Sequence, residues 1–227
     1  GAQPMTSRSG RYVIVYNGEI YNHLALREHL TGPWQGHSDT ETILALIEQV
    51  GFESALTQLV GMFAIALWDV KESRLHLARD RMGEKPLYYG WAGQDIVFAS
   101  ELKAVTAHPR AQKVLSQEAI FHYMRYSYVP APLSIYEGIF KLKPGQHICF
   151  DQESLRYHSL PEPHTYWSYQ QAVSSGRAAL FEGSDDEAKS LFHDALSQAV
   201  KGQLISDVPL GCFLSGGIDS SLIASVM

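Results

Sequence analysis

The pattern of apolar residues changes once along this chain, and the change divides it into two folded parts. Residues 1–159 contain short alternating apolar runs, typical of β-strands, with a few helical stretches between them. Residues 160–184 shift to Pro, Ser, Tyr and Gly without periodicity, which is typical of an interdomain linker. Residues 185–227 return to helical spacing and contain one apolar run. The sequence therefore predicts an α+β domain, a linker and the beginning of an α/β domain.

The first part is predicted to be a series of strands separated by Gly, Pro and charged turns. Asn17 and Gly18 lie between the apolar runs 12–16 and 20–21, and this pattern predicts a β-hairpin. Ser38 and Glu41 have the spacing of a capping box and predict a helix that closes at Gly51. The further expected elements are strands at 62–69, 75–79, 87–91, 96–100 and 147–151, and helices at 54–59 and 116–126.

The second part begins with a predicted amphipathic helix that Asp185 or Asp186 caps. Its apolar face comprises Leu191, Phe192, Ala195, Ala199 and Val200. Residues 208–214 are apolar throughout, as in a strand that is covered on both faces of a parallel sheet. Because the neighbours of this strand are not in the chain, we expect the residues after about 185 to be poorly packed.

Charge and composition disfavour several classes of function. The formal net charge is −6 and no basic run occurs, which argues against nucleic acids and membrane surfaces as partners. The apolar stretch 60–68 is shorter than the ~20 residues of a membrane span, and the first residues lack the centre of a signal peptide. We therefore expect a cytoplasmic protein. Cys149 and Cys212 are expected to be small buried side chains, and the ten histidines lack metal-ligand spacing.

The motif Ser-Gly-Gly-Ile-Asp-Ser-Ser at 215–221 has the chemistry of a phosphate site, and it opens another helix. Gly216 and Gly217 let the backbone approach a ligand closely, and the N–H groups of the helix start attract an anion. Asp219 fits such a site when Mg²⁺ is bound with the phosphate. The motif lacks the Gly-Lys-Ser/Thr of a Walker A loop, which disfavours a kinase or GTPase. An ordinary Gly-rich turn is the alternative.

Several further motifs precede this loop in a fixed order. They are Asn17-Gly18-Glu19-Ile20-Tyr21-Asn22, Ser38-Asp39-Thr40-Glu41, Ala78-Arg79-Asp80-Arg81 with Gly83, Lys85-Pro86-Leu87-Tyr88-Tyr89, and Ser100-Glu101-Leu102-Lys103. The loop at 215–221 resembles the pyrophosphate-binding loop of the ATP pyrophosphatases. Together, from Gln3 to Ser221, the motifs resemble the glutamine-hydrolysing asparagine synthetase family.

The resemblance implies an enzyme of two domains. The first is a glutaminase with an Ntn-hydrolase fold, an αββα sandwich, whose nucleophile is an N-terminal cysteine. The second is an α/β domain that uses ATP with Mg²⁺ to make an aspartyl-adenylate, which ammonia then converts to asparagine. The implied ligands are therefore small molecules, namely glutamine, ATP and a carboxylic acid, and no tightly bound cofactor is expected.

The resemblance also assigns residues to the glutamine site. Asn17 and Gly18 would form the oxyanion hole, although the pattern alone also fits a type I′ turn. Glu19 and Asp39 would hold the α-ammonium group of glutamine, and Asp39 is also a favourable acid in the first turn of its helix. Because Ser38 and Glu41 would complete the cap, the Asp39 side chain is expected to be free.

The ATP and pyrophosphate site implied by the resemblance comprises Phe213, Ser215, Gly216, Gly217, Asp219, Ser220 and Ser221. No metal site is expected in the protein alone. The pairs Arg79-Asp80 and Lys85-Pro86 are expected to have a structural or interdomain role.

Two features depart from the family pattern. Gly1 is not a nucleophile, and the chain stops at Met227 within a predicted helix. We therefore expect a piece of a longer protein, truncated in both domains, that catalyses neither half-reaction by itself. Three functions stay open for the parent: asparagine synthesis, adenylation of another carboxylate such as a sugar acid, or a non-catalytic glutaminase-like binding module. A homodimer is also left open.

Overall fold

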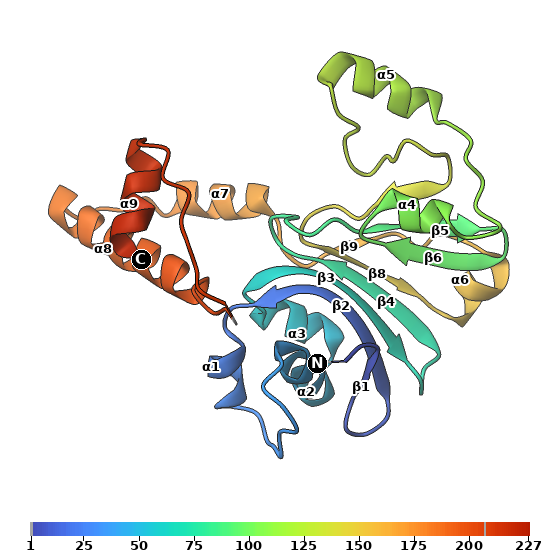
Figure 1. Ribbon diagram of the computed structural model, residues 1–227, viewed down its shortest axis with the longest axis horizontal. Helices are drawn as coiled ribbons and strands as arrows, with labels where there is room; N and C mark the ends of the chain where they lie inside the picture. The colour runs from blue at the N-terminus through green and yellow to red at the C-terminus, as the bar shows by residue number, and fades with distance from the viewer. Residues whose placement is uncertain (1, 207) are drawn as a thin grey trace. The chain divides into compact units, whose positions relative to one another are not determined.

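The computed structural model describes residues 2–206 and 208–227 (Figure 1). The chain forms two compact units, residues 1–171 and residues 172–227. The boundary between these units lies inside the segment 160–184 that the sequence analysis assigns to a linker.

The first unit contains two antiparallel sheets. The larger sheet has six strands in the order β1-β2-β3-β4-β8-β9, with bounds Met5–Thr6, Tyr12–Ile20, Gly61–Asp69, Arg74–Arg79, Gln146–Phe150 and His164–Thr165. The smaller sheet has the order β6-β5-β7, with bounds Asp95–Ala99, Tyr88–Ala92 and Ile139–Lys141. The five strands expected between residues 62 and 151 are all confirmed, each displaced by no more than one residue.

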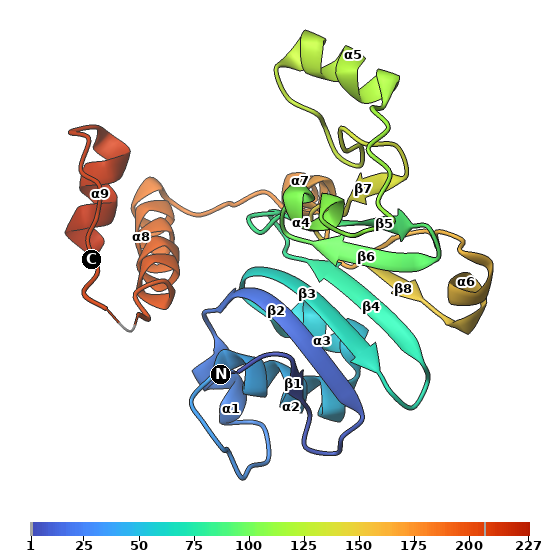
Figure 2. The same ribbon diagram turned by 45° about the vertical axis from the view of Figure 1, so that its right-hand side comes forward.

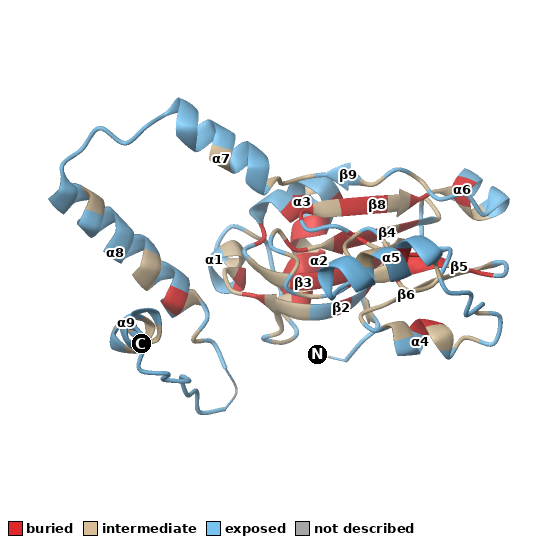
Figure 3. Ribbon diagram, turned by 90° about the horizontal axis from the view of Figure 1, so that it is seen from above, coloured by how far each residue is buried: buried red, intermediate tan, exposed pale blue. Residues whose placement is uncertain are grey.

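Two helices cover one face of the larger sheet, as Figures 1 and 2 show: α2, Asp39–Val50, and α3, Phe52–Gln58. Their buried side chains and those of β2 and β3 form one core cluster, which includes Ile14, Ile43, Ile47 and Ile65. The smaller sheet covers the opposite face, and a second cluster between the two sheets includes Ala66, Leu77, Tyr89 and Phe150. Figure 3 shows that buried residues concentrate in these layers. The helix–sheet–sheet order agrees with three layers of the predicted sandwich.

The other helices of the first unit are short. They are α1, His23–Arg27; α4, Leu102–Thr106, which lies against β6; α5, Gln117–Tyr126; and α6, Gln152–Tyr157. The Ser116 hydroxyl accepts a hydrogen bond from the Ala119 N–H and so caps α5, as expected. Across residues 2–206 and 208–227, no helix is both long and apolar enough to cross a membrane.

The predicted hairpin at Asn17 and Gly18 is wrong, because β2 runs straight through both residues. Asn17 pairs with Ala64 of β3 and Gly18 pairs with Phe63. A Cβ atom on Gly18 would overlap the backbone oxygen of Met62. The glycine is therefore needed for the close approach of two strands, rather than for the positive φ angles of a turn.

The capping box predicted for α2 forms only in part. The Ser38 hydroxyl accepts from the Thr40 N–H, which confirms Ser38 as the N-cap. Glu41, however, accepts from the N–H groups of Gln35 and Gly36, and not from that of Ser38. The loop before the helix thus supplies nearer donors for this carboxylate, and Gly51 ends the helix as expected.

The segment expected to be an irregular linker contains two elements. Strand β9 pairs with β8, where His164 lies opposite His147 and their rings stack 5.4 Å apart. The next residue but one, Tyr166, donates from its hydroxyl to the backbone oxygen of Arg79 over 2.7 Å. Helix α7, Tyr169–Ala178, then follows with no buried residue. The irregular stretch is therefore shorter than its composition indicates.

The second unit contains two complete helices, α8, Asp185–Gly202, and α9, Ile218–Val226. Ser184, rather than Asp185 or Asp186, caps α8 through a complete capping box with Glu187. Val200 is the buried residue of α8 and α9 has none, which agrees with the expected poor packing.

The strand predicted at 208–214 is wrong. These residues have no strand structure, and Val208, Leu210 and Phe213 are exposed. Cys212 is exposed as well, so the prediction of a buried side chain is wrong for this cysteine. A strand that is apolar on both faces needs partner strands and covering layers, and among the described residues of this unit the regular elements are helices.

Candidate functional site

Asn17 lies where the two sheets of the first unit meet. Its side-chain Nδ2 donates to the Ser100 hydroxyl over 3.0 Å, and Ser100 directly follows β6 of the smaller sheet. A cavity of about 130 Å³ adjoins this contact. Its lining comprises Val15, Tyr16, Asn17, Ala64, Ala66, Leu87, Phe98, Ala99 and Ser100. An amide donor is thus held at the mouth of a small, mainly apolar space.

Asp39 lies in the first turn of α2 and is fixed against β2. Its Oδ2 accepts a hydrogen bond from the Tyr16 hydroxyl over 2.8 Å and another from the Ile20 N–H over 3.0 Å. The expectation that the Asp39 side chain is free is therefore wrong for one of its oxygens. Among the described residues the other oxygen, Oδ1, accepts no hydrogen bond, and it keeps its capacity for a donor on a ligand.

The carboxylates of Glu19 and Asp39 both affect the pKa values of Tyr16 and His23. Burial lowers the pKa of His23, and the charges of Asp39 and Glu19 oppose that shift. Burial also raises the pKa of Tyr16, and Asp39 and Glu19 raise it further. Tyr16 therefore stays protonated and can donate to Asp39. Glu19 and Asp39 thus both contribute negative potential near Tyr16 and His23, which favours a cationic group, although burial outweighs this effect at His23 itself.

Gln3 holds the strand immediately before Asn17. Its side-chain amide donates to the Tyr16 carbonyl over 2.9 Å and accepts from the Tyr16 N–H over 2.6 Å. The side chain therefore acts as a one-residue strand partner for β2. Gln3, Tyr16 and Ser100 carry no sequence signal of a site role, because each acts through a neighbour that only the fold brings close.

Asp80 fixes the strand opposite Gly18. Its carboxylate is fully buried and accepts from the Phe63 N–H over 3.2 Å, and Phe63 is the pairing partner of Gly18. Three more backbone N–H groups donate to the same carboxylate, those of Met82, Glu84 and Lys85. Arg79 donates to the backbone oxygens of Gly83, Lys85 and Leu142. The structural role expected for the Arg79-Asp80 pair is confirmed.

The loop at 215–221 gathers small polar groups at the start of α9. Gly217 is the N-cap and no side chain caps the helix, so its first N–H groups keep their capacity for an anion. The Ser215 and Ser220 hydroxyls lie 3.0 Å apart, and Gly216 has φ +80°. Asp219 lies in the first helical turn. These small polar groups are compatible with the phosphate chemistry predicted for the loop. Phe213, which is also predicted for this site, has a fully exposed side chain.

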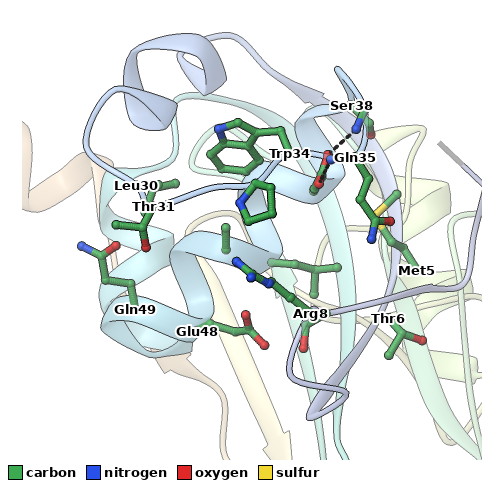
Figure 4. Close-up of a pocket in the computed structure, with 16 residues that line it drawn as sticks. Met5, Thr6, Arg8, Leu30, Thr31, Trp34, Gln35, Ser38, Glu48 and Gln49 are labelled. Carbon is green, nitrogen blue, oxygen red and sulfur yellow. Dashed lines mark hydrogen bonds between the residues drawn. The ribbon is translucent and has the colours of Figure 1, made fainter.

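A larger groove of about 700 Å³ lies elsewhere on the first unit, between β1, α2 and the loop 30–36 (Figure 4). Trp34 and Arg8 line it, and the guanidinium of Arg27 lies 4.2 Å from the centre of a Trp34 ring. None of the residues predicted for the glutamine or nucleotide sites lines this groove.

Cys149 has the environment of a structural thiol. It lies in β8, its Sγ is 3.9 Å from Nε2 of His76, and burial raises the pKa of the thiol. In the part of the chain that the structure describes, no three His, Cys, Asp or Glu side chains gather as metal ligands.

Comparison with known families gives two matches. Residues 1–167 match the glutamine amidotransferase domain family, which covers most of the chain. Residues 191–227 match the asparagine synthase family. The two matched regions follow one another in the order of the two parts that the sequence analysis distinguishes.

Curated relatives cover the whole chain. The asparagine synthetase [glutamine-hydrolyzing] 3 of Bacillus subtilis is 35% identical over 100% of this chain, which spans 36% of that protein. Amidase chry2 of Gibberella zeae is 32% identical, again over 100% of this chain and 34% of the relative. The chain therefore spans little more than a third of the length of these relatives.

Solved structures agree on the fold of the first unit. The glutamine phosphoribosylpyrophosphate amidotransferase of Bacillus subtilis, complexed with ADP and GMP, superposes with a TM-score of 0.50 and 20% identity, covering 73% of this chain and 32% of that one. An allosteric regulatory enzyme of purine biosynthesis gives 0.51 and 22%, over 73% and 31%. The predicted α+β class is confirmed, and the first unit shares its fold with these two enzymes.

Proposed function

Since this chain belongs to the glutamine amidotransferase domain family, we propose that it provides the glutamine-hydrolysing part of an asparagine synthetase. In the proposed reaction, glutamine is hydrolysed to glutamate and ammonia. Ammonia, ATP and aspartate then give asparagine, AMP and pyrophosphate. The observation that carries the proposal is the arrangement on β2, where an amide donor at Asn17 and a backbone N–H at Gly18 adjoin the anchored carboxylate of Asp39.

Amide hydrolysis needs donors where negative charge develops. When a nucleophile attacks the carboxamide carbon of glutamine, the carbonyl oxygen becomes an oxyanion, which the Asn17 Nδ2–H and the Gly18 N–H would stabilise. Preorganised donors of this kind lower a barrier by about 3 kcal/mol each. Cys149 and Cys212 both lie within the chain, and neither is assigned as the nucleophile.

The α-ammonium group of glutamine would bind beside the two carboxylates. Asp39 keeps one oxygen for a charge-assisted hydrogen bond, and its other oxygen is fixed by Tyr16 and Ile20. Glu19 would add a second negative charge from β2 itself. A substrate held at its amino-acid end in this way presents its carboxamide toward Asn17, because all these groups lie on or against β2.

The second unit would begin the ATP-using domain, of the α/β ATP-pyrophosphatase type. The match to the asparagine synthase family and the uncapped start of α9 support this assignment. The hydroxyls of Ser215, Ser220 and Ser221 and the N–H groups after Gly217 would hold the phosphate groups of ATP. Asp219 would bind the Mg²⁺ that accompanies ATP, and that ion would offset the charge of the leaving pyrophosphate.

The test uses the full-length protein with glutamine, ATP and aspartate. We expect asparagine, AMP and pyrophosphate in equal amounts, together with glutamate. The variant Asp219→Asn should lose AMP release and keep glutamate release, because it changes only the nucleotide site. AMP release with another carboxylic acid, such as a sugar acid, and none with aspartate would instead assign a related amidotransferase. Absence of glutamate release would leave the non-catalytic binding module as the better account.

A further inference from the structure

We propose that Ser100 is a positioning residue for glutamine hydrolysis, because its hydroxyl orients the Asn17 side-chain amide. The inference rests on the proposed function, which assigns Asn17 to the oxyanion hole. It adds a residue from the other sheet, so that the site would depend on how the two sheets of the first unit pack.

The contact joins parts of the chain that are distant in sequence. Asn17 is on β2 of the larger sheet and Ser100 follows β6 of the smaller one, 83 residues later. The Nδ2–Oγ distance is 3.0 Å, which is ordinary for a hydrogen bond. Among the described residues, Ser100 is the only side chain that forms a hydrogen bond with the Asn17 side chain.

The surroundings offer the Asn17 amide little else to bind. Its partner across the strand pair is Ala64, and Ala66 and Ala99 also line the adjoining cavity. The remaining polar side chain of that lining, Tyr16, uses its hydroxyl for Asp39. Asn17 itself is exposed, so without Ser100 its side chain would sample several rotamers.

The chemistry of the amide explains why such a contact helps. The NH₂ group carries two hydrogens, and one of them donates to Ser100. The other hydrogen can then donate to the oxyanion without further reorganisation. A donor that is already oriented stabilises a transition state more than one that must first be ordered, because the ordering cost falls outside the reaction step.

The first test measures glutamate release from glutamine by the full-length protein. Ser100→Ala should lower kcat about tenfold with KM changed less than about twofold, since the loss concerns the transition state. Ser100→Thr should restore most of kcat, because it keeps the hydroxyl and the cavity has room for one methyl group. Ser54→Ala, at an exposed serine of α3, is the matched control and should leave both constants unchanged.

The second test asks whether Ser100 acts through Asn17. In an Asn17→Ala background, the additional Ser100→Ala change should have no further effect on kcat. A tenfold loss in that background, or an unchanged kcat for Ser100→Ala alone, would overturn the inference and leave the proposed function intact. If the unmodified protein releases no glutamate, the proposed function fails and the inference fails with it.

Discussion

The Tyr16 hydroxyl donates a hydrogen bond to Oδ2 of Asp39 over 2.8 Å and so joins strand β2 to the first turn of α2. This relationship fixes a carboxylate beside the segment that carries Asn17 and Gly18. The backbone N–H of Ile20, also on β2, donates to the same oxygen. The orientation of the Asp39 carboxylate therefore depends on two contacts with this strand. The glutamine site proposed above thus rests on the packing of one helix on one strand.

Removal of the Tyr16 hydroxyl should weaken glutamine binding. Tyr16→Phe deletes a hydrogen bond to a charged group, and we expect a loss of about 1.5 kcal/mol in unfolding free energy. We also expect the KM for glutamine to rise roughly three- to tenfold, with kcat little changed. Tyr12→Phe, two side-chain positions earlier on the same face of β2, is the control. Equal KM values for the two variants would contradict the role given to Tyr16.

Gly18 should tolerate no side chain. In Gly18→Ala the new methyl group overlaps the backbone oxygen of Met62, so β2 and β3 must move apart. Urea unfolding should show a loss of about 2 kcal/mol or more. At Gly36 the nearest atom to a new Cβ is 3.8 Å away, and Gly36→Ala should change stability by less than about 0.5 kcal/mol. A stable Gly18→Ala protein would refute the close approach of the strands.

Asp80 should contribute to stability rather than to chemistry. Asp80→Ala leaves four backbone N–H groups without their acceptor, one of them in a buried and three in half-buried hydrogen bonds, and we expect a loss of about 3 kcal/mol or more in unfolding free energy. Asp95→Ala removes an exposed carboxylate that pairs with Arg110, so it should cost less than about 1 kcal/mol. Thermal unfolding of the two variants measures the difference, and similar transition temperatures would argue against the buried network.

Stability should fall in mildly acidic solution because of a half-buried histidine, His76. Burial and the nearby His147 lower the pKa of His76 to about 4. The His76 imidazole binds a proton more tightly in the unfolded state than in the folded state. Its contribution to the free energy of unfolding is therefore complete above pH 6.5 and is lost as the pH falls from about 6.5 to about 4. The loss attributable to His76 is about 3 kcal/mol.

The variant His76→Leu tests this pH dependence. It should flatten the decline between pH 6.5 and pH 4 in urea unfolding measured at several pH values. His37→Gln, at an exposed histidine, should keep the decline of the unmodified protein. An unchanged slope in His76→Leu would assign the acid sensitivity to other groups.

Local patterns predicted most of the sheets correctly. The runs around residues 62–69 and 147–151 are apolar throughout or alternate between apolar and polar residues, and Gly or Pro lies in the turns beside them. Both features indicate strands, and the structure has strands there. Ser116 is recognisable as a cap from the sequence because its hydroxyl accepts a hydrogen bond within its own turn. Such signals act over a few residues and are therefore visible in one sequence.

The errors concern signals with two physical meanings. An Asn-Gly pair fits a turn, and it equally fits a strand that needs a glycine for close approach, as at Gly18. Residues 208–214 have the composition of a buried strand but no partner strand among the described residues. The apolar pattern alone could not show whether a partner strand is present. The Asn17–Ser100 and Tyr16–Asp39 contacts arise only when elements distant in sequence pack together.

Steady-state glutamine hydrolysis by the full-length protein and two variants tests the central claim most directly. The account predicts that Asn17→Ala lowers kcat by about 10²- to 10³-fold with little change in KM, since it removes an oxyanion donor. Asp39→Asn should mainly raise the KM for glutamine, because it weakens the hold on the α-ammonium group. If neither variant differs from the unmodified protein, or if that protein releases no glutamate, the residues on β2 do not form a glutamine site.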